Sequence, residues 1–149
     1  VPVLANGPAD IDEAGADSSG VLKGCAVIVD DEPAILNALS DLLRQWGMEV
    51  KPFHSLHQVK HELQAAPDLV LADYQLLDGE TGLMVAQEVH TRWGAHIPVV
   101  LITGDTWTET IQVLRQTGFP VLHKPVRAHQ LRTLLGKLLQ ERPVRQISG

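Results

Sequence analysis

Residues 25–33 read CAVIVDDEP, an apolar and mostly β-branched run that ends in two adjacent aspartates and, two positions later, a proline. An apolar run without polar alternation is typical of a strand buried on both faces of a parallel sheet. Pro33 suits a first helical turn, and apolar residues then recur at helical spacing until Gly47. The stretch therefore predicts a strand that delivers Asp30 and Asp31 to the C-terminal edge of a sheet and then enters a helix.

The same alternation of strand and helix patterns occurs five times along the chain. Strands are predicted at 25–29, 48–53, 69–72, 97–102 and 120–123. Helices are predicted at 33–46, 55–65, 81–94, 106–117 and 128–140. Short connections and right-handed crossovers favour a doubly wound, five-stranded parallel sheet of the flavodoxin-like order 2-1-3-4-5, with helices on both faces.

Length and composition predict one folded unit. The chain has 149 residues with 44% hydrophobic content, enough for one good core. Residues 1–22 are small, polar and acidic, so we expect a disordered or linker leader. The folded domain is expected over 23–142, and a tail over 143–149.

Charge and hydropathy exclude several function classes. A formal net charge of −6 argues against a nucleic-acid-binding surface, which needs a clustered basic face. There is no apolar run of the roughly 20 residues that span a bilayer, and the first residues do not resemble a signal peptide. We therefore expect a cytoplasmic segment without membrane contact. Cys25 is the only cysteine, which excludes a disulfide within the chain and favours a small buried hydrophobe.

A second strand end brings a third carboxylate to the same edge. Asp73 follows the 69–72 strand, and in the order 2-1-3-4-5 that strand lies beside the one that ends at Asp30 and Asp31. An acid pair by itself often caps a helix N-terminus. Three carboxylates at one edge would repel one another unless a cation joined them, which favours a hard ion such as Mg²⁺, with Mn²⁺ as an alternative.

Thr103 and Lys124 follow the next two strands. Each has an ordinary interpretation, a strand residue before Gly104 and a solvated lysine before Pro125. Together with the acids they indicate a site that accepts a phosphoryl group on Asp73, with the lysine neutralising phosphoryl oxygens and the threonine hydrogen-bonding one of them. A cis Lys124–Pro125 peptide bond would aim the lysine inward, although trans is the commoner form.

This order of residues resembles the receiver domain of two-component response regulators over about residues 24–141. The spacings of 42, 30 and 21 residues between the second acid, the lone aspartate, the threonine and the lysine are similar to that family's. The resemblance implies that Asp73 is phosphorylated by a histidine kinase domain or a histidine phosphotransfer protein. It also implies an Mg²⁺ ion bound by Asp31, Asp73 and the backbone carbonyl of Gln75, with Asp30 ligating directly or through water. Such a domain catalyses only its own phosphorylation and dephosphorylation.

Residues 73–82 and 122–127 look most like receivers at the C-terminus of hybrid sensor histidine kinases, whose parent protein can be membrane-anchored. The alternatives are a stand-alone or output-linked response regulator and a pseudo-receiver that serves only as an interaction module; a homodimer is left open. A Mg²⁺-dependent phosphatase would need a second acid where Gln75 stands. A dinucleotide-binding domain is excluded because no Gly-x-Gly-x-x-Gly follows the first strand.

Two positions depart from the family pattern. Leu77 stands where a proline is common, in a loop that is about one residue longer. Val121 stands where the family's switch aromatic usually sits, so the usual coupling between threonine and aromatic is not expected. Gln75 and Asp105 flank the expected water path and are candidates for tuning the phosphoryl lifetime.

The remaining features favour ordinary surface or packing roles. His57 and His61 have a zinc-compatible spacing without a third ligand, so a solvated helix face is favoured. His123 is expected to pack rather than donate phosphate. Trp107 is open to either core or surface. Solvated surface is expected for the basic residues near the C-terminus: Arg127, Arg132, Arg142 and Arg145.

Overall fold

The structure is a computed structural model that describes residues 21–104 and 107–141. This part of the chain forms one parallel sheet in the order β2-β1-β3-β4-β5, as predicted. The strands are β1 Cys25–Val29, β2 Glu49–Phe53, β3 Leu69–Asp73, β4 Val99–Thr103 and β5 Val121–His123. The helices are α1 Pro33–Gln45, α2 Leu56–Glu62, α3 Gly82–Trp93, α4 Thr108–Gln116 and α5 Ala128–Glu141, with a short 3₁₀ segment, η2 Leu77–Gly79.

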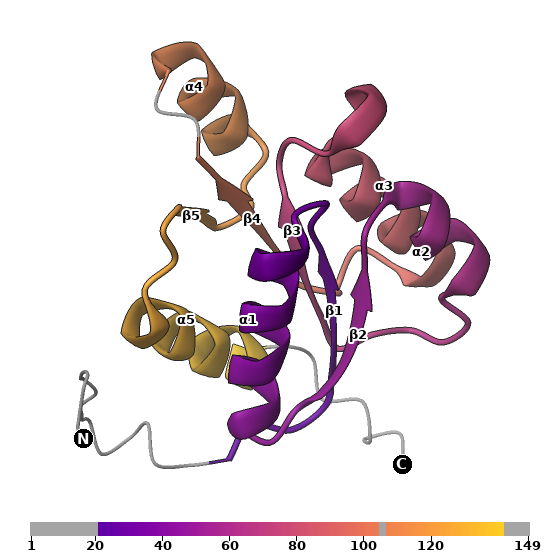
Figure 1. Cartoon of the computed structure of the whole chain (residues 1–149), viewed down its shortest axis with the longest axis vertical. Helices are drawn as coiled ribbons and strands as arrows, with labels where there is room; N and C mark the ends of the chain where they lie inside the picture. The colour runs from indigo at the N-terminus through magenta and orange to yellow at the C-terminus, as the bar shows by residue number, and fades with distance from the viewer. Residues whose placement is uncertain (1–20, 105–106, 142–149) are drawn as a thin grey trace.

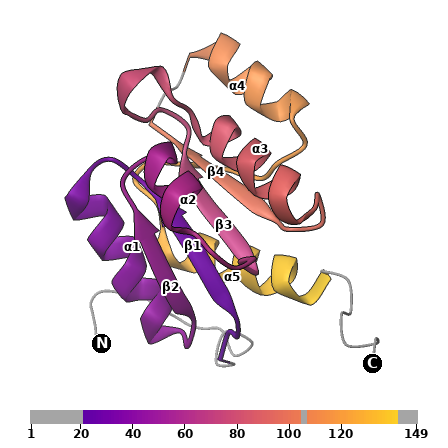
Figure 2. The same cartoon turned by 90° about the vertical axis from the view of Figure 1, so that its right-hand side faces the viewer.

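Helices cover both faces of the sheet (Figure 1). In the view turned by 90°, α2 and α3 lie in front of the sheet and α5 lies behind it (Figure 2). One core packs the side chains of α1 and α5 against alternate strand residues such as Ile28, Leu71 and Ile102. The other packs α2, α3 and Leu114 of α4 against the opposite set, which includes Leu101. Burial on both faces explains why the strands are apolar without alternation.

The strand registers align the carboxyl ends at one edge. Val29 pairs with Ala72, Asp73 pairs with Ile102, and Thr103 pairs with His123. Parallel pairing thus brings the first residues after β1 and the last residues of β3 and β4 to one end of the sheet. The fold delivers the predicted functional side chains to a common edge.

Element boundaries differ from prediction by one to three residues. The fourth strand starts at Val99 rather than at 97, after Pro98, which has no N–H for the ladder. The second helix ends at Glu62 rather than at 65, because Leu63 has an extended backbone. The predicted starts at Cys25, Pro33, Leu69 and Ala128 agree. Thr81 caps α3 as predicted, its hydroxyl accepting a hydrogen bond from the Met84 N–H at 3.3 Å.

The start of the described chain is attached to the core. Leu22 is 7% exposed, and its N–H donates to the Trp46 carbonyl at 2.8 Å. The predicted leader over residues 1–22 otherwise lies outside the described residues, and its boundary stays a prediction. Cys25 is only partly buried; burial, with the nearby Glu49 charge, raises the pKa of its thiol. None of the described helices is long and apolar enough to cross a bilayer.

Two expectations about side-chain exposure are wrong. Arg132 is 8% exposed, with its guanidinium 5.8 Å from the centre of the Trp46 ring, whereas solvated surface was predicted. A long aliphatic stem lets arginine cover apolar surface even though its head group is charged. His123 is exposed rather than packed, because it ends the edge strand. Arg127 is exposed as expected, and Arg142 and Arg145 lie outside the described residues.

Candidate functional site

Three aspartates gather at the C-terminal edge of β1 and β3. Asp30, Asp31 and Asp73 each offer a carboxylate oxygen within 4.8 Å of the others. Asp30 is 1% exposed and Asp73 is 6% exposed, so two of the three charges are largely withdrawn from water. Because like charges in a buried site disfavour ionisation, this arrangement requires counter-charges nearby.

Lys124 supplies one counter-charge. Its Nζ donates to Asp73 Oδ2 at 2.9 Å and lies 3.5 Å from Asp30 Oδ2. Burial by itself would lower the pKa of Lys124, but the hydrogen bond from Lys124 to Asp73 and the two carboxylate charges outweigh it and raise that pKa. The lysine is therefore an ammonium at neutral pH. The Lys124–Pro125 peptide bond is cis.

Asp30 remains incompletely satisfied. Its Oδ1 accepts the Glu32 N–H at 2.9 Å, whereas its buried Oδ2 has no hydrogen-bond partner among the described residues, the lysine contact being ionic only. Burial raises the pKa of Asp30, and the Asp73 charge adds to the effect, against the Glu32 N–H and the lysine. A buried carboxylate oxygen left without a hydrogen bond beside two further carboxylates fits a hard divalent cation. The residues present therefore suit Mg²⁺.

The loop after Asp73 is a small hairpin. Gln75 pairs with Thr81 in an antiparallel bridge, and a tight turn joins them through Asp78 at φ 59° and Gly79 at φ 77°. Two successive positive φ values define a type I′ turn, for which Asp-Gly is a preferred pair. Leu77 is the residue just before this turn, and its carbonyl accepts the Glu80 N–H at 3.2 Å.

The hairpin fixes the orientation of the Gln75 peptide group. The flanking hydrogen bonds run from the Leu76 N–H to the Glu80 carbonyl and from the Gly82 N–H to the Tyr74 carbonyl. This pattern makes Gln75 and Thr81 a non-hydrogen-bonded pair, whose own N–H and C=O groups point away from the partner strand. The Gln75 N–H donates to Asp73 Oδ1 at 3.3 Å. The Gln75 carbonyl therefore lies on the same side as the Asp73 carboxylate.

Gly82 lets α3 start directly beside the acid strand. A Cβ built at this position would lie 2.7 Å from the Asp73 carbonyl oxygen and 3.0 Å from a Leu101 methyl carbon. Only glycine allows this close approach without moving the backbone. Gly82, the first residue of the helix that follows Thr81, thus also allows the end of the hairpin to lie directly against β3.

Thr103 ends β4 and is 1% exposed. Its carbonyl accepts the Lys124 N–H at 2.9 Å, which ties the end of β4 to the residue that carries the ammonium group. The structure thus brings together the strand ends that carry the acids, Thr103 and Lys124. Gln75 joins them through its backbone, while Asp105 lies outside the described residues.

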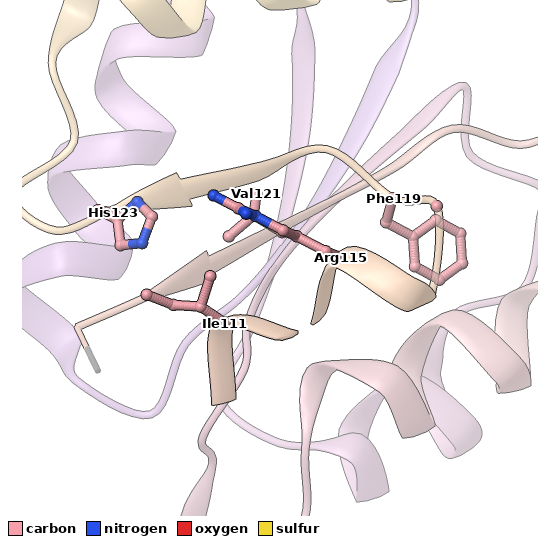
Figure 3. Close-up of a pocket in the computed structure, with 6 residues that line it drawn as sticks. Ile111, Arg115, Phe119, Val121 and His123 are labelled. Atoms are coloured by element: carbon pink, nitrogen blue, oxygen red, sulfur yellow. The ribbon is translucent and has the colours of Figure 1, made fainter. Parts of the chain in front are cut away.

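The side of β5 that faces α4 is open. A hollow of about 330 Å³ lies between them, lined by Ile111, Arg115, Gly118, Phe119, Val121 and His123. Figure 3 shows Arg115 extending from α4 toward β5, where Val121 and His123 project on the same side. Val121 does not fill this space. His57 and His61 lie exposed on α2 with their rings 4.3 Å apart, and no third His, Cys, Asp or Glu joins them within the described residues.

Fold and site together define a doubly wound α/β domain with an acidic pocket and a lysine at the switch point of its sheet. The sequence profile of the family described as "Response regulator receiver domain" matches residues 26–136. The chain belongs to this family, a component of two-component signal transduction.

Curated relatives support this membership. The chain is 34% identical over 119 residues to "Response regulator protein PilR" of Pseudomonas aeruginosa, covering 78% of this chain and 26% of that protein. It is 26% identical over 118 residues to "Nodulation protein W" of Bradyrhizobium diazoefficiens, covering 78% of this chain and 52% of that protein. The chain therefore spans about a quarter to a half of the length of these relatives.

Solved structures share the fold. The receiver domain of "BeF3 Activated DrrB" superposes with a TM-score of 0.70 at 21% identity, covering 80% of this chain and 100% of that one. The receiver domain of the PhyR response regulator of Erythrobacter litoralis gives a TM-score of 0.69 at 25% identity, covering 85% and 96%.

Sequence reasoning missed the hairpin and the role of Glu80 within it. The Asp78-Gly79 dipeptide is a strong short-range signal for a tight two-residue turn and could have revealed the hairpin. Glu80 carries no local signal, because its partner lies 24 residues earlier in the chain.

Proposed function

We propose that the chain is the phosphoacceptor receiver of a response regulator, which takes a phosphoryl group from a histidine onto Asp73. The observation that carries this proposal is the 2.9 Å contact between Lys124 Nζ and Asp73 Oδ2 inside a cluster of three carboxylates. In this contact a positive charge lies beside the carboxylate of Asp73. Asp73 ends β3, which lies between β1 and β4, and the hairpin follows it directly.

In the proposed reaction the bond between phosphorus and the donor imidazole nitrogen breaks as a bond to an Asp73 carboxylate oxygen forms, and the electron pair of the broken bond returns to the imidazole. The Lys124 ammonium neutralises charge on the phosphoryl oxygens, and the Thr103 hydroxyl donates a hydrogen bond to one of them. A bound Mg²⁺ ion would supply further charge neutralisation and orientation. Asp31, Asp73 and the Gln75 carbonyl would hold it, with Asp30 binding directly or through water.

The partner in this proposal is a histidine kinase domain or a histidine phosphotransfer protein, as family membership implies in general. The relative PilR is named a response regulator, so we favour a stand-alone or output-linked regulator over the C-terminal receiver of a hybrid sensor kinase. The proposed receiver unit spans residues 23–142.

The test is covalent labelling by a small acyl phosphate with Mg²⁺, read by intact mass. Wild type should gain one acid-labile phosphoryl group, and Asp73→Asn should gain none. Asp41→Asn, an exposed acid on α1, is the matched control and should label like wild type. Equal labelling of Asp73→Asn would show that the phosphoacceptor is another residue.

A further inference from the structure

Glu80 links the hairpin beside Asp73 to a helix distant in sequence. Its Oε1 accepts the N–H of Leu56, the first residue of α2, at 3.2 Å. The first N–H groups of a helix have no partner within the helix. The Ser55 side chain accepts the Gln58 N–H at 3.1 Å, so Glu80 satisfies a different one of these groups.

The same residue is part of the hairpin backbone. The Glu80 N–H donates to the Leu77 carbonyl at 3.2 Å, and the Glu80 carbonyl accepts the Leu76 N–H at 2.9 Å. Its neighbour Thr81 pairs with Gln75. A restraint on the Glu80 side chain is therefore passed through two hydrogen bonds and one bridge to the Gln75 peptide group.

We propose that Glu80 is a positioning residue of the phosphoacceptor site: by binding the Leu56 N–H it anchors the hairpin to α2 and holds the Gln75 carbonyl beside Asp73. This inference rests on the proposed function, since it assigns the Gln75 carbonyl to the cation that supports phosphorylation. Without the anchor, the only described contact of the Glu80 side chain is lost, and the hairpin keeps its backbone hydrogen bonds and the close approach of Gly82 to β3 but has no described link from Glu80 to α2.

The mutual effect of Mg²⁺ binding and the Glu80 contact distinguishes a positioning role of Glu80 from simple capping of α2. If the Glu80 contact favours the hairpin geometry that binds Mg²⁺, then Mg²⁺ must strengthen the Glu80 contact by the same factor. Exchange of the Leu56 amide with solvent should then slow when Mg²⁺ is added. A cap that serves only α2 would leave that exchange unchanged.

The experiment measures Mg²⁺ affinity by titration for wild type, Glu80→Ala, Glu80→Gln and Glu62→Ala. Glu80→Ala should weaken binding by about tenfold, as loss of a supporting contact at a metal site does. Glu80→Gln loses the same charge but keeps the acceptor oxygen, so it should stay within about twofold of wild type. Glu62→Ala removes an exposed acid at the far end of α2 and should bind like wild type.

Equal affinities of Glu80→Ala and Glu80→Gln would overturn the inference, as would an unchanged Leu56 exchange rate on adding Mg²⁺ to wild type. Thermal unfolding of each variant shows whether it is folded, and the Leu56 exchange rate of wild type with and without Mg²⁺ carries the test if the alanine variant is not. Absence of labelling on Asp73 in a wild type that binds Mg²⁺ would refute the proposed function and leave the Glu80 result standing. Labelling with no effect of Glu80→Ala on affinity would refute the inference alone.

Discussion

The two halves of the C-terminal sheet edge differ in how closely their side chains are packed. At β1 and β3, buried acids, an ammonium contact at 2.9 Å and a hairpin surround Asp73, and a glycine brings α3 against the strand. At β5, Val121 borders a hollow of about 330 Å³, and α4 buries only Leu114 among its residues. The difference indicates that the surroundings of Asp73 are closely packed, whereas the surface beside β5 is loosely packed.

This contrast bears on how a change at the acidic site would be passed to other parts of the domain. A valine at position 121 has no ring that could move between an inner and an outer position. One described connection from the acidic site to another element is the Glu80 contact with Leu56 of α2.

The largest difference is expected between two glycines. Gly82→Ala should lower the free energy of unfolding by about 3 kcal/mol, because its Cβ would overlap backbone that cannot yield. Gly118→Ala, in the loop beside the hollow, meets no atom within 4 Å and costs only its positive φ of 80°, about 1 kcal/mol. Denaturant unfolding measures both values, and equal costs would contradict the contrast.

Mg²⁺ should stabilise the protein only through the acid edge, that is, the cluster of Asp30, Asp31 and Asp73. At ten times its dissociation constant, the ion should add about 1.4 kcal/mol to the free energy of unfolding, and a chelator should remove it. Asp31→Asn should lose most of this increment, because it removes one carboxylate of the cluster. Val121→Ala should keep the full increment in the same thermal unfolding assay. A loss in Val121→Ala would mean that the two sides are coupled in the metal-bound state.

The smallest effect is expected where the structure has room. Val121→Phe should change the free energy of unfolding by no more than about 0.5 kcal/mol, because the ring can enter the hollow beside Phe119. Its register partner Leu101 is fully buried, so Leu101→Phe should cost about 1–3 kcal/mol through overpacking. Thermal unfolding of the pair checks the comparison, and a costly Val121→Phe would show that the hollow is closed in solution.

Sequence patterns predicted the features that depend on period and strand order. Continuous apolar runs identified the buried strands, and the switch in strand order placed Asp30, Asp31 and Asp73 together. Pro33 and Thr81 marked two helix starts correctly because their effect on a helix is local.

Features that depend on tertiary neighbours were not predicted. Arg132 lies beside the ring of Trp46, which directly follows α1, and the exposure of His123 follows from its place on an edge strand. The contact from Glu80 to Leu56 joins segments 24 residues apart, which no local period encodes. Side chains with long reach are thus where pattern-based prediction has least information.

The buried Leu22 has a consequence for the modular history of the domain. Its side chain belongs to the core, and its N–H is bonded to the Trp46 carbonyl ahead of the first strand. A recombination event that joined this domain to a new neighbour would need its junction upstream of Val21 to keep that side chain. A junction at Gly24 would transfer Asp30, Asp31 and Asp73 but would remove the Leu22 side chain from the core at the opposite end of the sheet.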